Sequence, residues 1–252
     1  MPAGHYHLNL AQTGWRPATP GPVPPGQIHL WRIGLRGADP AAARRVLCPD
    51  ELTRAERFHR AADHDRYVVT RAALRRILAA STPPRAPAAL RFRYSPHGKP
   101  ALAAAGGLSF NVSHDRDYAL VALGRGVAPL GVDLERVDHS IPVADLVSRF
   151  FAPAEQRAVL NLPERQRHEA FFRTWTRKEA FIKAHGGGLS IPLDRFAVSV
   201  DFGAPASLSW VDWRGERAGC WQLWSFTVAE GLPGALALGG AAAEPTIGFY
   251  DY

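Results

Sequence analysis

The stretch TRKEAFIK at 176–183 aligns without gaps on TRAALRRI at 70–77. Both stretches lie in long segments with helical periodicity, and each segment leads into a loop rich in glycine or proline. Short strands follow in both places, so the order of helix, loop and strands occurs twice. The repeated order predicts two similar halves, 1–125 and 126–252, which join near GRGVAP at 124–129. The alignment supports the repeat or is a chance agreement, because only Thr and Arg match.

Alternating and periodic apolar residues predict the elements of the first half. A strand is expected over 27–35, after a lead-in rich in proline and glycine. Residues 50–80 have the spacing of two helices, with Phe58 among the positions expected in the core. A short strand at 90–94 and a strand, polar turn and strand over 108–124 complete this half.

The second half repeats these signals. A strand is expected over 128–138, and helices over 143–184. Further strands are expected near 195–202, 207–213 and 220–238.

Composition limits the class of protein and of partner. The chain has 252 residues, is 46% hydrophobic, and carries 30 Lys+Arg against 23 Asp+Glu, a net charge of +7. This charge favours anionic partners such as nucleic acid, phosphorylated small molecules or acidic proteins. Cys48 and Cys220 are far apart and lack metal-ligand spacing. With neither a signal peptide nor a membrane-spanning segment in the sequence, we expect a soluble, unprocessed protein of the cytoplasm.

Two carboxylates lie two positions apart in LGVDLERVD, 130–138. On a strand, Asp133 and Glu135 project from one face while Val132 and Leu134 project from the other. The pair is either a solvated strand end neutralised by an arginine, or part of a Mg²⁺ site, because hard cations prefer oxygen ligands.

A third acid lies on a helix stripe. Trp175, Glu179 and Lys183 are spaced i, i+4 and i+8, so they share one face of the predicted helix. Trp175 could be a core residue beside a surface Glu179–Lys183 pair, or the acid could complete the metal site. Ser113 and His114, placed in a turn between two strands, could bind a phosphate, although a lone histidine is more often structural.

Five motifs together resemble the Sfp-type 4'-phosphopantetheinyl transferases. They occur in the family's order and spacing and are HGKP (97–100), FNVSH (110–114), GVDLE (131–135), RFFAPAE (149–155) and WTRKEAFIKAHGGGLSIPL (175–193). The resemblance implies an α+β fold, a pseudo-twofold monomer of two similar halves, with coenzyme A between them.

The resemblance also implies roles for individual residues. Asp133, Glu135 and Glu179 would hold Mg²⁺, and Lys183 would contact the pyrophosphate of coenzyme A. By the same resemblance, Glu179, Lys183 and Asp133 are the catalytic residues, and Glu179 is a metal ligand, a general base or both. The expected contacts to the rest of coenzyme A are Arg66, Lys99, Ser113 and His114.

The implied reaction transfers 4'-phosphopantetheine from coenzyme A to a serine of an acyl or peptidyl carrier protein and releases adenosine 3',5'-bisphosphate. Carrier proteins of this kind are acidic. The arginines between 149 and 177, interspersed with Phe150, Phe151, Leu160 and Leu162, suit docking of an acidic helix.

Two other classes compete with this interpretation. A nucleic-acid-binding protein would explain the charge and leave the three acids unexplained. A Mg²⁺-dependent phosphodiesterase would use the same acids on a different substrate.

Overall fold

The computed structural model describes residues 14–83, 85–104, 106–127, 129–201, 203–240 and 244–252. The chain divides into two compact units. The first unit consists of described residues within 14–127 and 244–252, and the second of those within 129–240.

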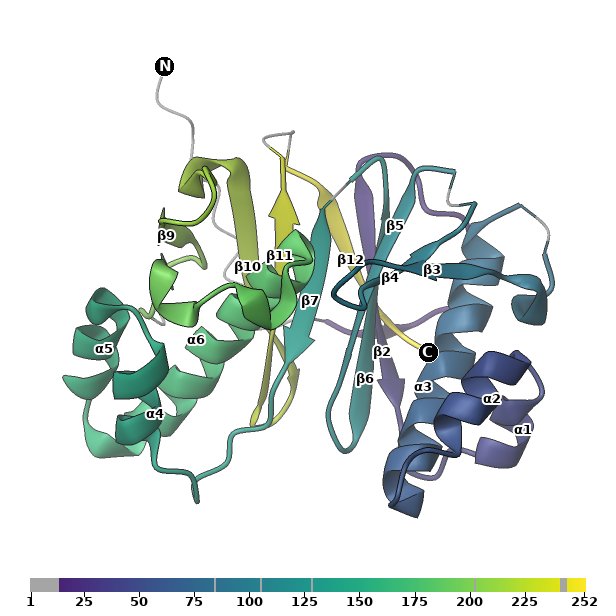
Figure 1. Cartoon of the computed structure of the whole chain (residues 1–252), viewed down its shortest axis with the longest axis horizontal. Helices are drawn as coiled ribbons and strands as arrows, with labels where there is room; N and C mark the ends of the chain where they lie inside the picture. Colours follow the sequence, from purple (N-terminus) through teal and green to yellow (C-terminus); the bar gives the residue numbers. More distant parts are fainter. Residues whose placement is uncertain (1–13, 84, 105, 128, 202, 241–243) are drawn as a thin grey trace. The chain divides into compact units, whose positions relative to one another are not determined.

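The first unit is built on a sheet with the strand order β1-β12-β2-β6-β5. Its strands are β1 (Arg16–Pro17), β2 (Gln27–Gly34), β5 (Leu108–His114), β6 (Tyr118–Arg125) and β12 (Thr246–Asp251). The helix α3 (Ala61–Ser81) covers one face of this sheet (Figure 1). Leu74 and Ile77 of α3 pack with Trp31 and Ile33 of β2 and with Val121 of β6. The periodic apolar residues of α3 therefore form the core of this unit.

Smaller elements flank α3 in the first unit. They are α1 (Pro40–Arg44), α2 (Pro49–Ala55), a one-turn 3₁₀ helix (Pro87–Ala89), and a hairpin of β3 (Phe92–Tyr94) and β4 (Pro100–Leu102). The two helices predicted within 50–80 are confirmed as α2 and α3. Phe58 was expected in the core, and this was wrong: it lies in the loop between the two helices with 39% of its surface exposed.

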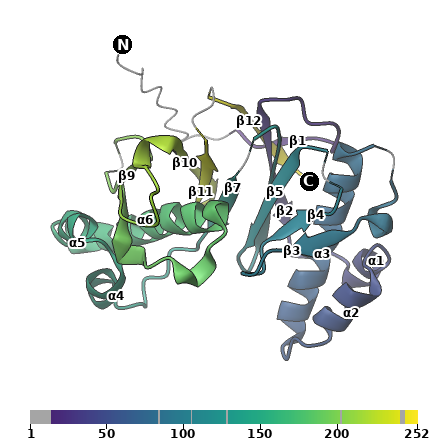
Figure 2. The same ribbon diagram turned by 45° about the horizontal axis from the view of Figure 1, so that its top comes forward.

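The second unit has a sheet with the order β7-β11-β10. Its strands β7 (Leu130–Leu134), β10 (Trp221–Ala229) and β11 (Leu232–Gly239) are antiparallel. The helix α6 (Glu164–His185) lies against this sheet, as Figure 2 shows. Its apolar residues, such as Phe181 and Ala184, belong to the core cluster there. The remaining elements are α4 (Val143–Phe150), α5 (Pro153–Leu160), the hairpin β8 (Phe196–Val198) and β9 (Leu208–Val211), and 3₁₀ turns at Gly188–Ser190, Leu193–Arg195 and Ala218–Cys220.

The two units share one topology. In each unit, a strand is followed by a series of helices, and the last helix of the series is the longest, with 21 residues in α3 and 22 in α6. A small hairpin and two further strands come next. The strand order β2-β6-β5 in the first unit corresponds to β7-β11-β10 in the second. The stretches 70–77 and 176–183 lie in the equivalent helices α3 and α6. The α+β class and the repeat predicted from the sequence are therefore confirmed.

The C-terminal strand departs from the predicted division at 125/126. β12 pairs in parallel with β2 and with β1, so it extends the sheet of the first unit. Arg32 of β2 donates two hydrogen bonds to Asp251, of 2.7 and 3.0 Å, and this ion pair attaches the end of the chain to that sheet. The division predicted from the sequence placed this segment in the second half, and no strand was predicted there.

Candidate functional site

Asp133 is the fourth residue of β7, the edge strand of the second sheet, and only 2% of its surface is exposed. Every residue of β7 is buried, so the strand is covered on both faces. A carboxylate in such a strand requires a nearby positive or hydrogen-bonding group, because an isolated buried charge is strongly unfavourable.

Gly131 explains why the helix lies so close to this strand. A Cβ atom on Gly131 would lie 2.2 Å from the carbonyl oxygen of Ala180 and 2.3 Å from the amide nitrogen of Ala184, both in the backbone of α6. Backbone atoms cannot rotate away from such a contact as a side chain can. The missing side chain therefore permits the close packing of β7 on α6.

This packing brings Lys183 to Asp133. The ammonium Nζ of Lys183 donates to Oδ1 of Asp133 at 2.6 Å, and about 30% of the lysine side chain is exposed. The two residues are 50 positions apart in the sequence. The lysine neutralises the buried carboxylate and still reaches solvent, from which an anionic ligand could approach.

Glu179 lies one helical turn before Lys183 on the same face of α6. Burial raises the pKa of the Glu179 carboxyl, and the negative charge of Asp133 raises it further, while Lys183 opposes both effects. The structure thus brings Asp133, Glu179 and Lys183 together. A carboxylate with a raised pKa is a better proton acceptor than an ordinary one.

Glu135 follows the end of β7 and is half-buried. Across the described ranges, no three His, Cys, Asp or Glu side chains form a group that could hold a metal ion. The structure therefore does not assemble Asp133, Glu135 and Glu179 into a three-ligand set. Carboxylate oxygens are nevertheless the donors that Mg²⁺ prefers, so the pair of Asp133 and Glu179 fits such an ion in its chemistry.

The other predicted residues lie in the first unit. Ser113 and His114 are the last two residues of β5, rather than part of a turn; Ser113 is buried and His114 is exposed. Arg66 is on α3 and forms an ion pair of 2.9 Å with Asp63, one turn earlier.

Lys99 lies in the turn between β3 and β4. The turn is closed by hydrogen bonds from Ser95 N to Lys99 O at 2.9 Å and from Lys99 N to the Ser95 hydroxyl at 3.1 Å. Burial lowers the pKa of the Lys99 ammonium to about 8. Bringing an anion to Lys99 would favour its charged form.

A pocket of about 530 Å³ opens in the first unit. It is lined by Arg54, Arg57, Phe58, Tyr67 and Tyr94, together with two acids of α2. Arg54 lies over the Tyr67 ring at 5.6 Å, and the rings of Phe58 and Tyr67 are 5.4 Å apart. Tyr94 ends the strand that leads into the Lys99 turn. The pocket combines aromatic faces with two guanidinium groups, a lining that suits a flat, anionic ligand.

This pocket was not predicted from the sequence, although Arg54, Arg57 and Phe58 are neighbours in the chain. Phe58 breaks the expected helix pattern, because α2 ends at Ala55 and α3 begins at Ala61. An aromatic residue between two helix ends was the available signal.

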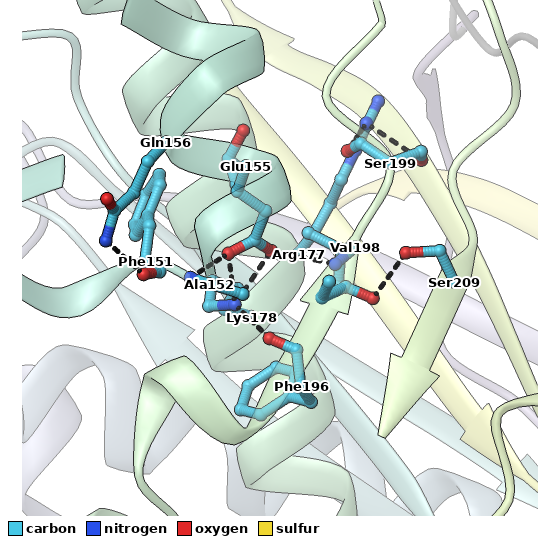
Figure 3. Close-up of polar contacts among 12 residues, drawn as sticks. Phe151, Ala152, Glu155, Gln156, Arg177, Lys178, Phe196, Val198, Ser199 and Ser209 are labelled. Atoms are coloured by element: carbon cyan, nitrogen blue, oxygen red, sulfur yellow. Dashed lines mark hydrogen bonds and ion pairs between the residues drawn. The ribbon is translucent and has the colours of Figure 1, made fainter. Parts of the chain in front are cut away.

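A buried ion pair beside Glu179 was also missed. Lys178 donates to both carboxylate oxygens of Glu155 (Figure 3), at 2.7 Å in each case. Neither residue is exposed by more than 1%. Burial lowers the pKa of Lys178 to about 8 and raises the pKa of Glu155. Burial thus disfavours the ionised form of each residue, whereas the charge of its partner favours that form. The sequence signal for Glu155 was its place three residues after Ala152 and two after Pro153, which is typical of a helix N-terminus.

Comparison with known protein families gives two matches that together span most of the chain. Residues 129–238 match the model described as the 4'-phosphopantetheinyl transferase superfamily. Residues 37–125 match the model described as 4'-phosphopantetheinyl transferase, N-terminal.

Individual relatives agree with these matches. The 4'-phosphopantetheinyl transferase HetI of Nostoc sp. (strain PCC 7120) is 32% identical over 247 residues, which cover 96% of this chain and 100% of that protein. The 4'-phosphopantetheinyl transferase Sfp of Bacillus subtilis (strain 168) is 33% identical over 110 residues, 43% of this chain and 47% of that one. A solved structure, the holo-[acyl-carrier-protein] synthase of Thermotoga maritima, matches with a TM-score of 0.36 and 19% identity, covering 46% of this chain and 65% of that one.

Proposed function

Because the chain belongs to the 4'-phosphopantetheinyl transferase superfamily and is a 4'-phosphopantetheinyl transferase, we propose that coenzyme A donates the group that it transfers. We also propose that Mg²⁺ assists the transfer. The resemblance predicted from the motifs is confirmed at the level of the family. Members of this family transfer phosphopantetheine to carrier proteins. The cluster of Asp133, Glu179 and Lys183 carries the proposal for the residues involved.

In the proposed reaction, the serine hydroxyl of the carrier attacks the phosphorus that bears the pantetheine arm. The P–O bond to the second phosphate breaks, a new P–O bond to serine forms, and adenosine 3',5'-bisphosphate leaves. The serine proton is accepted by Glu179, directly or through a water molecule, in the general-base role that the motif implies. Lys183 stabilises the negative charge that develops on the leaving phosphate, because its ammonium reaches solvent beside the two acids.

Asp133 and Glu179 are the residues that would hold Mg²⁺, with Glu135 as the third ligand implied by the motif. A bound Mg²⁺ neutralises pyrophosphate oxygens and orients them. Asp133 holds Lys183 by the 2.6 Å contact, so the same carboxylate positions the protein's own cation. Phosphoryl transfer depends chiefly on such positioning and charge neutralisation.

The first unit supplies the proposed contacts to the nucleotide end of coenzyme A. We assign them to Lys99, Ser113, His114 and Arg66, as the motifs imply, and add the pocket that contains Arg54 and Arg57. Adenine is flat and the 3'-phosphate is anionic, so the ring faces and guanidinium groups match the two parts of this ligand.

Replacing Arg57 by Gln is expected to raise KM for coenzyme A about tenfold with little change in kcat, because a charged contact made equally in ground and transition states is lost. Dephospho-coenzyme A, which lacks the 3'-phosphate, should show the same KM with wild type and variant. The control is Arg76→Gln, an exposed arginine of α3 outside the pocket lining. A tenfold rise with both donors would show that Arg57 does not contact the 3'-phosphate.

The carrier is proposed to be acidic and to dock on the helices of the second unit. Arg149, Arg157 and Arg165 are exposed on α4, α5 and α6. The expected surface is smaller than the sequence suggested, because Phe151 and Arg177 are buried. Arg177 instead donates at 2.8 Å to the Ser225 hydroxyl.

Raising the salt concentration is expected to increase KM for the carrier far more than KM for coenzyme A. Exposed charges are screened within about 10 Å at 0.1 M salt, whereas partly buried contacts are screened less. Steady-state transfer rates at several salt concentrations measure both constants. Equal sensitivity of the two constants would contradict docking through exposed arginines.

The whole proposal is tested by incubating the protein with coenzyme A, Mg²⁺ and an apo carrier protein. The expected result is a mass gain of about 340 Da on the carrier, the mass of the phosphopantetheine group transferred by the displacement at phosphorus. Chelation of the metal should stop the gain. Cleavage of coenzyme A without carrier modification would favour the phosphodiesterase alternative. Binding of nucleic acid with no reaction of coenzyme A would favour the alternative that the chain is a nucleic-acid-binding protein.

No described helix of the chain combines the length and the apolar character needed to cross a bilayer. The cytoplasmic location and the monomeric state expected from the sequence remain predictions.

A further inference from the structure

The ion pair of Glu155 and Lys178 is fully satisfied by hydrogen bonds. Lys178 Nζ donates at 2.7 Å to each oxygen of Glu155 and at 2.7 Å to the carbonyl of Phe196. Glu155 also accepts the amide protons of Ala152, at 2.9 Å, and Val198, at 2.8 Å. Every proton of the ammonium therefore has an acceptor, and both carboxylate oxygens are used.

These bonds join three elements of the second unit. Glu155 caps the N-terminus of α5, Phe196 and Val198 belong to β8, and Lys178 belongs to α6. Figure 3 shows the lysine and the carboxylate meeting between these elements, with the carbonyl of Phe196 directed at the lysine nitrogen. The network holds α6 on the side that faces α5 and β8.

The opposite constraint on α6 comes from β7. Gly131 lets β7 contact the backbone of α6 at Ala180 and Ala184. Successive residues of an α-helix project about 100° apart around its axis, so fixing Lys178 on one side also fixes the direction of Glu179. Lys183 lies one turn after Glu179 and shares its face. Rotation of α6 would move both side chains away from Asp133.

The first unit has a similar buried ion pair between its short helix α2 and its long helix α3. Glu51 is the third residue of α2, accepts the amide proton of Cys48 at 3.0 Å, and is bound by Arg71 and Arg75 of the long helix α3. In both units a buried glutamate thus caps a short helix and binds a base of the long helix. In the second unit the base is the residue immediately before Glu179.

The contribution of this pair to the site is geometric rather than electrostatic. The charges that shift the pKa of Glu179 are those of Asp133 and Lys183. The charge of Lys178 is compensated by Glu155. A buried ion pair also seldom stabilises a fold more than apolar residues of the same size, because desolvation offsets the attraction. Apolar residues could not replace the directional hydrogen bonds of the Glu155–Lys178 pair, which fix the orientation of α6.

We propose that Glu155 and Lys178 are positioning residues for phosphopantetheine transfer, which set the rotation of α6 so that Lys183 contacts Asp133 and Glu179 lies within the electrostatic influence of Asp133. The inference rests on the proposed function of those three residues. It predicts that stability and turnover can be separated by changing the pair.

The deciding variant is the double substitution Glu155→Gln with Lys178→Met. Both replacements are uncharged and close in size to the originals, so the melting temperature should remain within about 3 °C of wild type. The three-way connection is lost, so kcat should fall about 100-fold, the effect of misplacing a reacting group by about 1 Å. KM for coenzyme A should change little, because the nucleotide contacts that we propose lie in the first unit.

The single variant Lys178→Met is expected to melt about 10 °C lower, because it leaves a buried carboxylate without its cation. The matched control is Val159→Ala, which removes buried apolar atoms from α5 and no hydrogen bond. It should lower the melting temperature by about 5 °C or more and leave kcat unchanged.

Recovery of normal kcat in the double variant, or an equal loss of kcat in Val159→Ala, would overturn the positioning role and leave the proposed function standing. If wild type transfers no phosphopantetheine from coenzyme A, the proposed function fails first. The melting temperatures separate both outcomes from a failure to fold.

Discussion

Replacing Glu179 by Gln is expected to abolish transfer and to raise the stability of the fold at neutral pH. Removing a general base costs about 10²–10⁴-fold in rate, and loss of a metal contact adds to this. The stability gain follows from the raised pKa of the Glu179 carboxyl, which burial and then Asp133 cause. An ionised carboxylate in that position opposes folding, and an uncharged amide does not.

The sign of this effect sets its dependence on pH. Since the folded pKa lies above the ordinary value near 4.5, the unfolded chain releases this proton at lower pH than the folded chain. The stability that Glu179 provides is therefore fully present below the unfolded pKa and is lost as pH rises through the folded one. The free energy of unfolding of the variant should match that of wild type near pH 4 and exceed it at pH 7 by about 0.5–2 kcal/mol, the usual size for a single stabilising substitution.

Urea unfolding at a series of pH values measures the stability difference, and the carrier mass assay measures transfer. The control is Glu169→Gln on the same helix, where an exposed carboxylate pairs with Arg173 at 2.7 Å. The Glu169→Gln variant should transfer phosphopantetheine at the wild-type rate, and its free energy of unfolding should not exceed that of wild type. A Glu179→Gln protein with a near-normal rate would remove Glu179 from the reaction, and one without added stability at pH 7 would contradict the raised pKa.

Replacing Gly131 by Ala is expected to reduce stability and transfer together. The added methyl group would lie within 2.3 Å of two backbone atoms of α6, so the strand and the helix must separate. Overpacking of this kind costs about 1–3 kcal/mol. Separation also moves Asp133 away from Lys183 and Glu179, and a displacement of about 1 Å lowers kcat about 100-fold.

Thermal melting and steady-state kinetics check both parts of this prediction. Gly219→Ala is the matched control in the same unit, because nothing lies within 4 Å of the position that its Cβ would take and its φ is not positive. This variant should resemble wild type in both measurements. A Gly131→Ala protein that loses stability but keeps its kcat would show that the contact of β7 with α6 does not position the acids.

Local sequence patterns predicted the parts of the site that lie within one element. Glu179 and Lys183 are four residues apart, so helix geometry alone places them on one face. Asp133 and Glu135 are two residues apart, and side chains alternate between the two faces of a strand, so strand geometry alone places both acids on one face. The repeat was also visible, because both long helices keep Thr and Arg at matched positions, Thr70 and Arg71 against Thr176 and Arg177.

Contacts between distant elements were not predictable in this way. Nothing local to Lys178 indicates that Glu155, 23 residues earlier, will bind it in the interior. Arg177 looked like a surface arginine beside docking residues and is buried, because which side of a helix is covered depends on the elements packed against it. The parallel pairing of β12 with β2 joins segments more than 200 residues apart and leaves no periodic signal.

The repeated α+β architecture, the family and the set of chemically suitable side chains were predictable from the amino-acid sequence, because these depend on periodicity, motif and residue type. Three features depend on the tertiary structure: the ion pair of Asp133 with Lys183, the electrostatic effect of Asp133 on Glu179, and the place of Phe58 in the lining of a pocket. The reason is the close contact at Gly131 and the opposing network at Lys178, which determine how α6 lies on β7. That packing depends on shape and hydrogen bonding between segments far apart in the chain, which no local pattern encodes.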